Sequence, residues 1–172
     1  MLGAAAAVSL AACASAPQSE RPTAAAVTAP RAVASPQADP SDRPVLNLGG
    51  AVADLAADMV GARYRLGGNE PVQGFDSSGL AFYAYDQAGY PIPRTSEDQF
   101  RAAHKIALAD ATAGDLLFFQ DQAKLSHVGI YLGDGLFVHA PATGRQVSVA
   151  RIDAPYYQEQ LIAVGRLLPP GL

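Results

Sequence analysis

The hydrophobic pattern of this chain changes from a helical period to a strand-like period at Gly114. Before that residue, apolar side chains recur at helical spacing over residues 52–60, and a second apolar segment begins at Leu80. Helices followed by an antiparallel meander predict an α+β fold, with N-terminal helices packed on an antiparallel sheet of about five or six strands. The expected strands are 116–119, 128–132, 136–140, 147–149 and 161–167.

The N-terminal part of the chain does not have the composition of a folded domain. Residues 2–12 form an apolar run too short to span a membrane but suited to the apolar core of a signal peptide. Residues 14–45 are rich in Ala, Pro, Ser and Thr, so they cannot bury enough apolar area to offset their ordering entropy. We expect a signal segment at 1–13, a disordered tether at 14–45 and one folded domain at 46–172.

Small residues precede Cys13, and this segment resembles the processing site of bacterial lipoproteins. The resemblance implies a lipid anchor on Cys13 and a place in the periplasm or cell envelope. Because Ala14 rather than Asp follows the cysteine, it favours the outer membrane over the inner one. No Lys or Arg precedes the apolar run, which departs from the pattern, and an ordinary cleaved signal peptide is the alternative.

Charge and cysteine content exclude several kinds of partner and site. The formal net charge of -4 argues against nucleic acid, which is bound by basic patches. Cys13 is the only cysteine, so the chain forms no intrachain disulfide and no thiolate metal cage. The sequence has no phosphate loop and no metal-ligand spacing.

The polar segment Gly74–Leu80 runs directly into the second apolar segment. Asp76 or Ser77 can cap the helix that follows, and Gly89 stands where a left-handed residue would end it. A cap at this place sets a small hydroxyl side chain at the positive end of a helix dipole. Taken alone, the segment is an ordinary helix cap.

Two histidines later in the chain indicate that the capped segment could be part of a catalytic site. The hairpin loop Gly133–Gly135 has three residues, so His127 and His139 should share a sheet face, within two residues of being opposite, unless a bulge intervenes. With Ser77 nearby they would supply a base, an orienting group and a nucleophile. The alternatives are ordinary strand histidines or a metal site, for which no third ligand has suitable spacing. We interpret His104 as a solvated residue at a helix end.

These segments, in their order and spacing, resemble the NlpC-type cell-wall peptidases, which are papain-like cysteine peptidases. The resemblance covers about residues 50–168 and implies a papain-like fold. The segments that carry it are Tyr64–Gly68, Gly74–Leu80, Pro93–Ser96, Gly114–Phe119 and His127–Ala140.

The resemblance assigns a role to each matching residue. It implies that Ser77 occupies the nucleophile position, His127 is the general base and His139 orients the base. It further implies substrate-binding positions at Tyr64, Asp76 and Ser78. The implied substrate is the peptidoglycan stem peptide, typically cut between D-glutamate and the diamino acid. No metal or organic cofactor is implied, and we expect a monomer.

Ser77 departs from the family, which has cysteine at this position. Papain-like catalysis starts from a thiolate–imidazolium pair, and a serine hydroxyl ionises far less readily than a thiol. We therefore expect this form to be inactive or weak. The sequence leaves three explanations open: an engineered inactivating change, a natural module that binds stem peptides without cutting them, or a working serine hydrolase of amides or esters.

Overall fold

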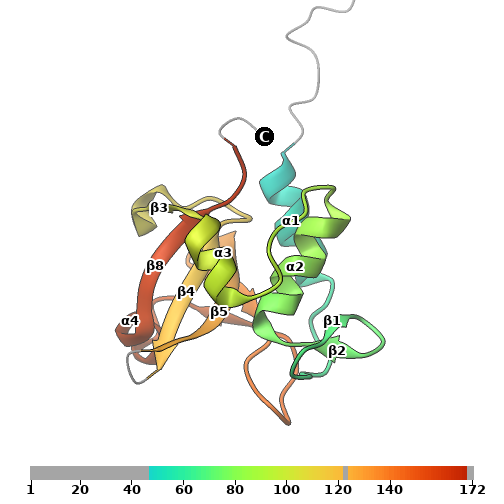
Figure 1. Cartoon of the computed structure of the whole chain (residues 1–172). Helices are drawn as coiled ribbons and strands as arrows, with labels where there is room; N and C mark the ends of the chain where they lie inside the picture. The colour runs from blue at the N-terminus through green and yellow to red at the C-terminus, as the bar shows by residue number, and fades with distance from the viewer. Residues whose placement is uncertain (1–46, 122–123, 170–172) are drawn as a thin grey trace, which may run out of the picture. The chain divides into compact units, whose positions relative to one another are not determined.

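The computed structural model describes residues 47–121 and 124–169, which contain four α-helices and eight β-strands (Figure 1). The expected signal segment, the expected tether and Cys13 lie outside the described residues. None of the helices in the described part combines the length and the apolar character that a membrane crossing requires.

The first helix, α1, spans Leu48–Ala57. The side chain of Asn47 caps it by accepting a hydrogen bond from the Gly50 N–H at 2.9 Å. The prediction of a helix in this region is confirmed, but the helix ends earlier than residue 60. Val60 lies beyond its last turn and is 50% exposed, so it does not belong to the buried stripe.

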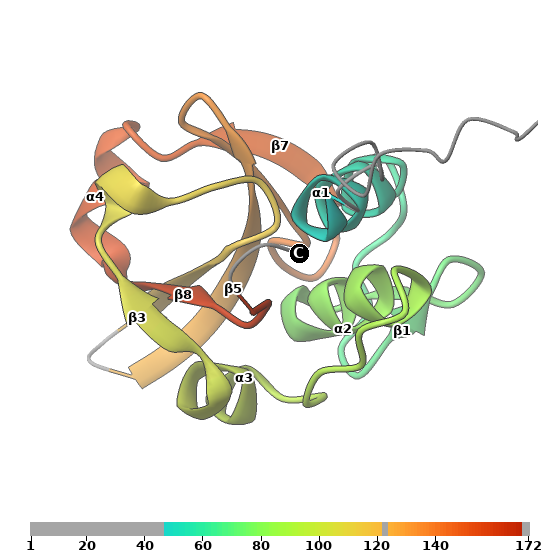
Figure 2. The same cartoon turned by 90° about the horizontal axis from the view of Figure 1, so that it is seen from above.

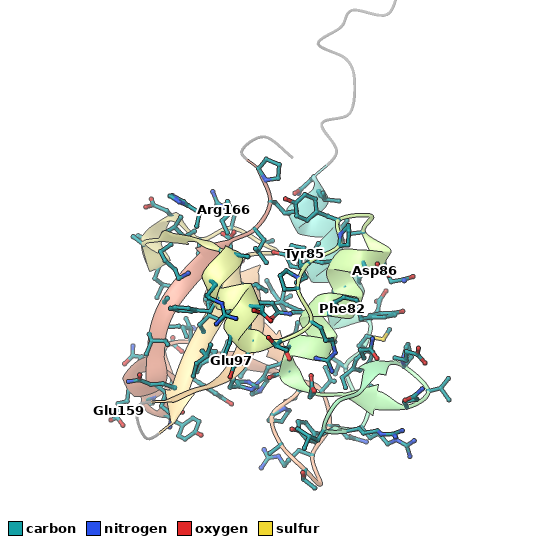
Figure 3. All side chains as sticks on the ribbon, viewed as in Figure 1. Phe82, Tyr85, Asp86, Glu97, Glu159 and Arg166 are labelled. Atoms are coloured by element: carbon teal, nitrogen blue, oxygen red, sulfur yellow. The ribbon has the colours of Figure 1, made fainter. Side chains whose placement is uncertain are left out.

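The second helix, α2, spans Ser77–Gln87 and bears out the expected cap and end. Asp76 is the cap, since its carboxylate accepts the Gly79 N–H at 2.7 Å. Gly89 follows the helix with a positive φ of 82°, the left-handed conformation that glycine adopts without strain. Tyr85 and Asp86 point to opposite sides of α2, one buried and one exposed (Figure 3).

The third helix, α3, spans Ser96–Ala102. The cap is Thr95, whose hydroxyl accepts the Asp98 N–H at 3.2 Å and donates to the Asp98 carboxylate at 2.7 Å. Gln99 of this helix is fully buried, and its amide donates to the carbonyl of Ser78 at 3.0 Å.

The main sheet has six antiparallel strands in the order β3-β8-β4-β5-β6-β7. All five strands expected from the sequence are present. The strand β3, the small β1–β2 hairpin and the helix α4 were not predicted, because these elements are too short to show a hydrophobic period. The bounds are β1 Asn69–Glu70, β2 Gly74–Phe75, β3 His104–Ile106, β4 Leu116–Asp121, β5 Lys124–Gly133, β6 Leu136–His139, β7 Ser148–Arg151, α4 Pro155–Gln160 and β8 Leu161–Arg166.

The register of β5 and β6 is the one that the hairpin loop predicted. Ile130 pairs with Val138. Continuing that register places His139 opposite Gly129, which is two residues from His127 on the same face. The bulge in this pair lies nearer the turn, so it does not change the face on which either imidazole lies.

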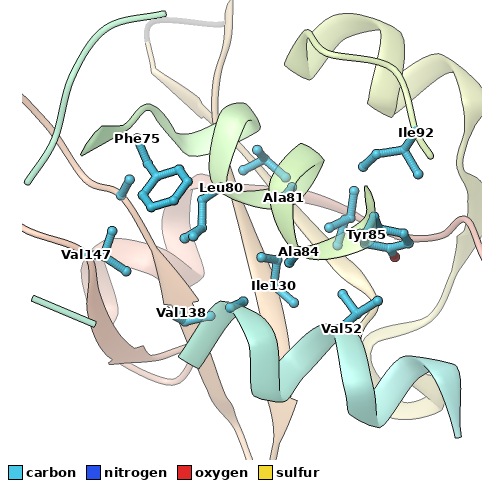
Figure 4. Close-up of a cluster of buried hydrophobic side chains, with 14 of the residues drawn as sticks. Val52, Phe75, Leu80, Ala81, Ala84, Tyr85, Ile92, Ile130, Val138 and Val147 are labelled. Atoms are coloured by element: carbon cyan, nitrogen blue, oxygen red, sulfur yellow. The ribbon is translucent and has the colours of Figure 1, made fainter. Parts of the chain in front are cut away.

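The two faces of the curved sheet pack against different partners. Helices α1 and α2 lie side by side against one face (Figure 2), and the buried side chains between them form the larger core (Figure 4). That core includes Val52, Leu80, Ala84, Tyr85, Val128, Ile130 and Val138. The opposite face carries a smaller cluster of Leu117, Phe119, Phe137, Ile152 and Val164, with Tyr157 of α4 against it.

Candidate active site

The two strand histidines contact each other directly. Nε2 of His127 lies 2.8 Å from Nδ1 of His139, which is a hydrogen bond between the two imidazoles. Both project from the sheet face opposite α1 and α2, in the neighbourhood of the smaller apolar cluster. The prediction that they share a face is confirmed. Among the residues that the structure describes, Nδ1 of His127 has no hydrogen-bond partner, so it is available to a third group.

Aromatic rings surround the histidine pair. Phe119 stacks at a tilt against His127 with ring centroids 5.8 Å apart, and Phe137 meets His139 edge-on at 5.0 Å. Tyr157 of α4 meets His139 edge-on at 5.5 Å. A pocket of about 240 Å³ opens beside the pair. Its lining residues are Phe119, His127, His139, Pro141, Tyr156, Tyr157 and Gln160.

Burial keeps both histidines neutral at physiological pH. Burial, followed by the neighbouring His139, lowers the pKa of His127 to about 3. Burial, followed by the positive charge of Arg145, lowers the pKa of His139 to about 4. A neutral pair of this kind holds one proton on each ring, so each imidazole both donates and accepts.

Ser77 is the first residue of α2. The amide N–H groups of Ser77 and Ser78 have no acceptor among the described residues, so they are free to bind an anion or a developing oxyanion. The first turn of α2 and the start of β5 both lie on the lower side of the domain in Figure 1. Over residues 47–121 and 124–169, no hydrogen bond joins Ser77 to His127 or His139. The structure thus pairs the two histidines and leaves the serine hydroxyl outside that pair.

The carboxylate of Asp76 accepts several hydrogen bonds from neighbouring residues. Its carboxylate accepts the Gly79 and Gly67 N–H groups at 2.7 and 2.8 Å, and Arg94 donates to both of its oxygens at 3.0 and 2.9 Å. Ser78 donates to the same carboxylate at 3.2 Å. Burial would raise the pKa of Asp76, but the hydrogen bonds from Arg94 and Gly79 outweigh it and lower the pKa. Substrate binding by Asp76 and Ser78 stays a prediction.

Tyr64 lies close to this ionic cluster. Burial, followed by the negative charge of Asp76, raises the pKa of its phenol, so the hydroxyl stays protonated and can donate. Its backbone N–H donates to the Arg145 carbonyl at 2.9 Å. A shallow pocket of about 430 Å³ adjoins the cluster. It is lined by Leu66, Gly67, Asp76, Ser78, Arg94, Thr95, Ser96 and Glu97.

Sequence reasoning missed two residues of this region. Arg94 lies in the segment Pro93–Ser96, but neither it nor Tyr157 was predicted as a residue of the site. A signal for Tyr157 was present in the sequence, where Pro155 directly precedes two tyrosines between two expected strands. Proline is common at the first position of a helix, so this pattern predicts a helix start. His104 is exposed, as expected, although it begins β3 rather than ending a helix. No group of His, Cys, Asp or Glu side chains suited to a metal occurs in the described part of the chain.

Comparison with known proteins gives one family and several relatives. The NlpC/P60 family matches residues 61–166. The chain is 37% identical over 117 residues to murein DD-endopeptidase MepH of Escherichia coli, covering 65% of this chain and 43% of that protein. It is 38% identical over 110 residues to the bifunctional muramidase/DL-endopeptidase CwlT of Bacillus subtilis, covering 62% and 33%. The chain thus spans less than half the length of these relatives.

Two solved structures show the same architecture. An NLP/P60 family protein from Staphylococcus aureus, described as similar to lipoprotein, matches with a TM-score of 0.63 and 33% identity, covering 71% of this chain and 42% of that one. The NlpC/p60 domain of the peptidoglycan hydrolase SagA matches with a TM-score of 0.61 and 34% identity, covering 69% and 97%. The predicted papain-like α+β fold is confirmed.

Proposed function

We propose, because this chain belongs to the NlpC/P60 family, that its domain is a peptidoglycan stem-peptide endopeptidase in which Ser77 holds the nucleophile position. Two observations support this. The relatives include a murein DD-endopeptidase and a DL-endopeptidase. The bond of 2.8 Å between His127 and His139 is the geometry of a base and its orienting partner, and it is the observation that carries the proposal.

The reaction would use the free nitrogen of the histidine pair. As the residue at position 77 attacks the scissile amide carbon, Nδ1 of His127 takes its proton. The N–H groups at the start of α2, which have no acceptor in the described part of the chain, stabilise the oxyanion. His127 then returns the proton to the leaving amine, and an acyl-enzyme remains. Water attacks the acyl carbon and gives a proton to His127. His127 passes that proton to the departing side-chain atom of residue 77, which releases the second peptide and restores both the nucleophile and the neutral base.

Ser77 weakens this chemistry at its first step. A thiol beside an imidazole supplies a standing thiolate, whereas a hydroxyl must lose its proton during the attack. The low pKa of His127 makes it a poor acceptor for that proton. A deficit of about 5 kcal/mol at the transition state lowers the rate by several powers of ten. The form with Ser77 is therefore expected to be weak or inactive.

The test compares the full chain with its Ser77→Cys variant on purified peptidoglycan, with released peptides identified by mass spectrometry. Cleavage by the cysteine form alone supports a peptidase lacking only its nucleophile. Cleavage by both forms supports a working serine hydrolase. The Ser77→Cys variant carrying His127→Gln is the matched control, and its activity should be lost. If neither form cleaves, the endopeptidase proposal is wrong.

The second candidate function is recognition of stem peptides without cleavage. This function is favoured by the serine at position 77, where the family has cysteine. It is also favoured because, in the described part of the chain, no hydrogen bond joins Ser77 to either histidine. Calorimetric titration of the unaltered chain with a stem peptide tests it. Binding by both forms, with cleavage by neither, would support this reading.

We also propose that Cys13 carries a lipid that anchors the protein in the cell envelope, in the outer membrane rather than the inner one. The sequence around Cys13 supports this. Metabolic labelling with a palmitate analogue should mark the unaltered chain and not its Cys13→Ala variant. Fractionation of the two membranes then tests the location, and sedimentation of the detergent-free Cys13→Ala variant tests the expected monomer.

A further inference from the structure

Tyr157 extends the histidine pair by one more hydrogen bond. Its hydroxyl oxygen lies 3.4 Å from Nε2 of His139, and Nδ1 of His139 lies 2.8 Å from Nε2 of His127. The three side chains therefore form one hydrogen-bonded row. We propose that Tyr157 is a positioning residue, whose hydroxyl fixes the tautomer of His139 and thereby leaves Nδ1 of His127 unprotonated.

Two proton arrangements are consistent with this row. Each neutral imidazole carries one proton, so the choice made at one ring decides the other. In the first arrangement both histidines hold their proton on Nε2, and the oxygen of Tyr157 accepts from His139. In the second, both hold it on Nδ1, and the hydroxyl of Tyr157 donates to His139. Only the first leaves a lone pair on Nδ1 of His127.

The first arrangement is favoured by the intrinsic chemistry of imidazole and by the catalytic step. The Nε2–H form is the more stable tautomer of a free neutral histidine side chain, so both rings prefer it. A base that has accepted a proton is a donor at both nitrogens, so Nε2–H of His127 then needs Nδ1 of His139 as its acceptor. This second reason rests on the proposed function.

In the first arrangement, the Nε2–H group of His139 depends on the Tyr157 oxygen as its acceptor. Its side chain is only 3% exposed, so bulk water is poorly placed to accept from Nε2. In the part of the chain that the structure describes, the Tyr157 oxygen is the partner of that nitrogen. Tyr157 itself is partly exposed, so its own proton can be donated to solvent while its oxygen accepts.

The ring of Tyr157 is held independently of its hydroxyl. It packs edge-on against Phe137 with centroids 4.9 Å apart, and against Phe119 at 5.6 Å. The Tyr157→Phe change therefore removes the acceptor and keeps the packing. Tyr156 is its neighbour on α4 and is 62% exposed. Tyr156→Phe is therefore the matched control, because it removes a tyrosine hydroxyl that is not part of the hydrogen-bonded row.

The tautomers can be read directly by nitrogen NMR. The chain has three histidines, so the 15N-labelled full-length protein gives few imidazole spin systems, with exposed His104 as an internal reference. At neutral pH we expect His127 and His139 to be protonated on Nε2. Tyr157→Phe should shift both towards a mixture of tautomers, and Tyr156→Phe should not. Protonation on Nδ1 in the unaltered chain, or no shift in Tyr157→Phe, overturns the proposal.

Catalysis supplies a second readout in the Ser77→Cys form. There Tyr157→Phe should lower kcat about three- to tenfold, the effect of one hydrogen bond, with little change in KM. With His139→Asn in place, the same change should cost nothing further, because an amide carbonyl accepts from His127 without a tautomer to select. An equal loss in both backgrounds would show a structural role and overturn the proposal.

The two readouts separate this inference from the proposed function. If the Ser77→Cys form fails to cleave peptidoglycan, the endopeptidase proposal is lost while the NMR experiment still decides the role of Tyr157. If it cleaves and the imidazole signals do not respond to Tyr157→Phe, the peptidase proposal stands and the role of Tyr157 is lost.

Discussion

Arg94 binds both carboxylate oxygens of Asp76, through Nη1 at 3.0 Å and Nη2 at 2.9 Å. Nη2 also donates to the carbonyl of Gly68 at 3.1 Å. One guanidinium thus joins the segment before α3 to the cap of α2 and to the loop before β1. A planar fork of this kind is suited to a carboxylate in a way that a lysine ammonium is not.

The first prediction concerns the stability that this fork provides. Arg94→Lys should lower the free energy of unfolding by about 2 kcal/mol, because the partly buried carboxylate of Asp76 loses its paired donors. Urea unfolding followed by circular dichroism measures it. Arg101→Lys is the control, since the Arg101–Asp98 pair is exposed and should change stability by less than about 0.5 kcal/mol. Equal losses would contradict the prediction.

The second prediction concerns the closest packing at the start of α2. In most helices Gly→Ala stabilises by about 1 kcal/mol. A Cβ on Gly79, however, would lie 2.0 Å from the carbonyl oxygen of Gly68 and 2.9 Å from Nη2 of Arg94. We expect Gly79→Ala to destabilise the domain by about 2 kcal/mol or more. Thermal unfolding tests the sign, and Gln87→Ala in the exposed last turn of α2 should change little.

The third prediction concerns pH. Both strand histidines have folded-state pKa values, about 3 and about 4, below the value of about 6.5 in an unfolded chain. Stability is therefore fully present above pH 6.5 and falls as the pH drops towards 4, because only the unfolded chain binds protons in that window. By pH 5.5 we expect a loss on the order of 1 kcal/mol for each histidine.

The measurement is the free energy of unfolding at several pH values between 7.5 and 4.5. His127→Gln combined with His139→Asn should flatten the curve across that window, whatever its effect on stability at pH 7. The depressed pKa of Asp76 acts at lower pH, since its stabilising contribution is lost only as the carboxylate protonates. A curve with the same slope in both proteins would show that the histidines titrate normally.

Much of this architecture follows from local patterns in the sequence. The expected strands and the shared face of His127 and His139 follow from the period of two residues and from a loop of known length. The cap, expected at Asp76 or Ser77, follows from short side chains whose oxygen accepts a first-turn N–H. Elements without a period were missed. The strands β1 and β2 have two residues each, and α4 has six.

The contacts of the candidate site were harder to predict than its backbone. Arg94 and Asp76 are 18 residues apart, and nothing local to either residue selects the other. The bond from Tyr157 to His139 likewise depends on where α4 packs, which is a tertiary property. Sequence periodicity predicts on which face of a helix or strand a polar side chain lies. Its hydrogen-bond partner, however, comes from another element of the fold.

The last prediction concerns a thiol introduced at position 77. Within the described residues, N–H groups in the first turn of α2 have no acceptor, and a helix N-terminus together with a nearby histidine lowers a thiol pKa. In the Ser77→Cys form we expect the pKa of that thiol to lie below the usual value of about 8.5. The thiolate that forms beside His127 should raise the pKa of that imidazole above its value in the serine form.

The rate of alkylation by iodoacetamide as a function of pH measures this thiol. Cys13 is the only other cysteine, so the experiment uses Cys13→Ala in both proteins. Adding His127→Gln should raise the apparent pKa and slow alkylation at pH 6, because the helix N-terminus then acts without a cation beside it. An apparent pKa at or above 8.5 that does not respond to His127→Gln would show that position 77 and the histidine pair do not act together. The endopeptidase mechanism proposed for this domain would then fail at its first step.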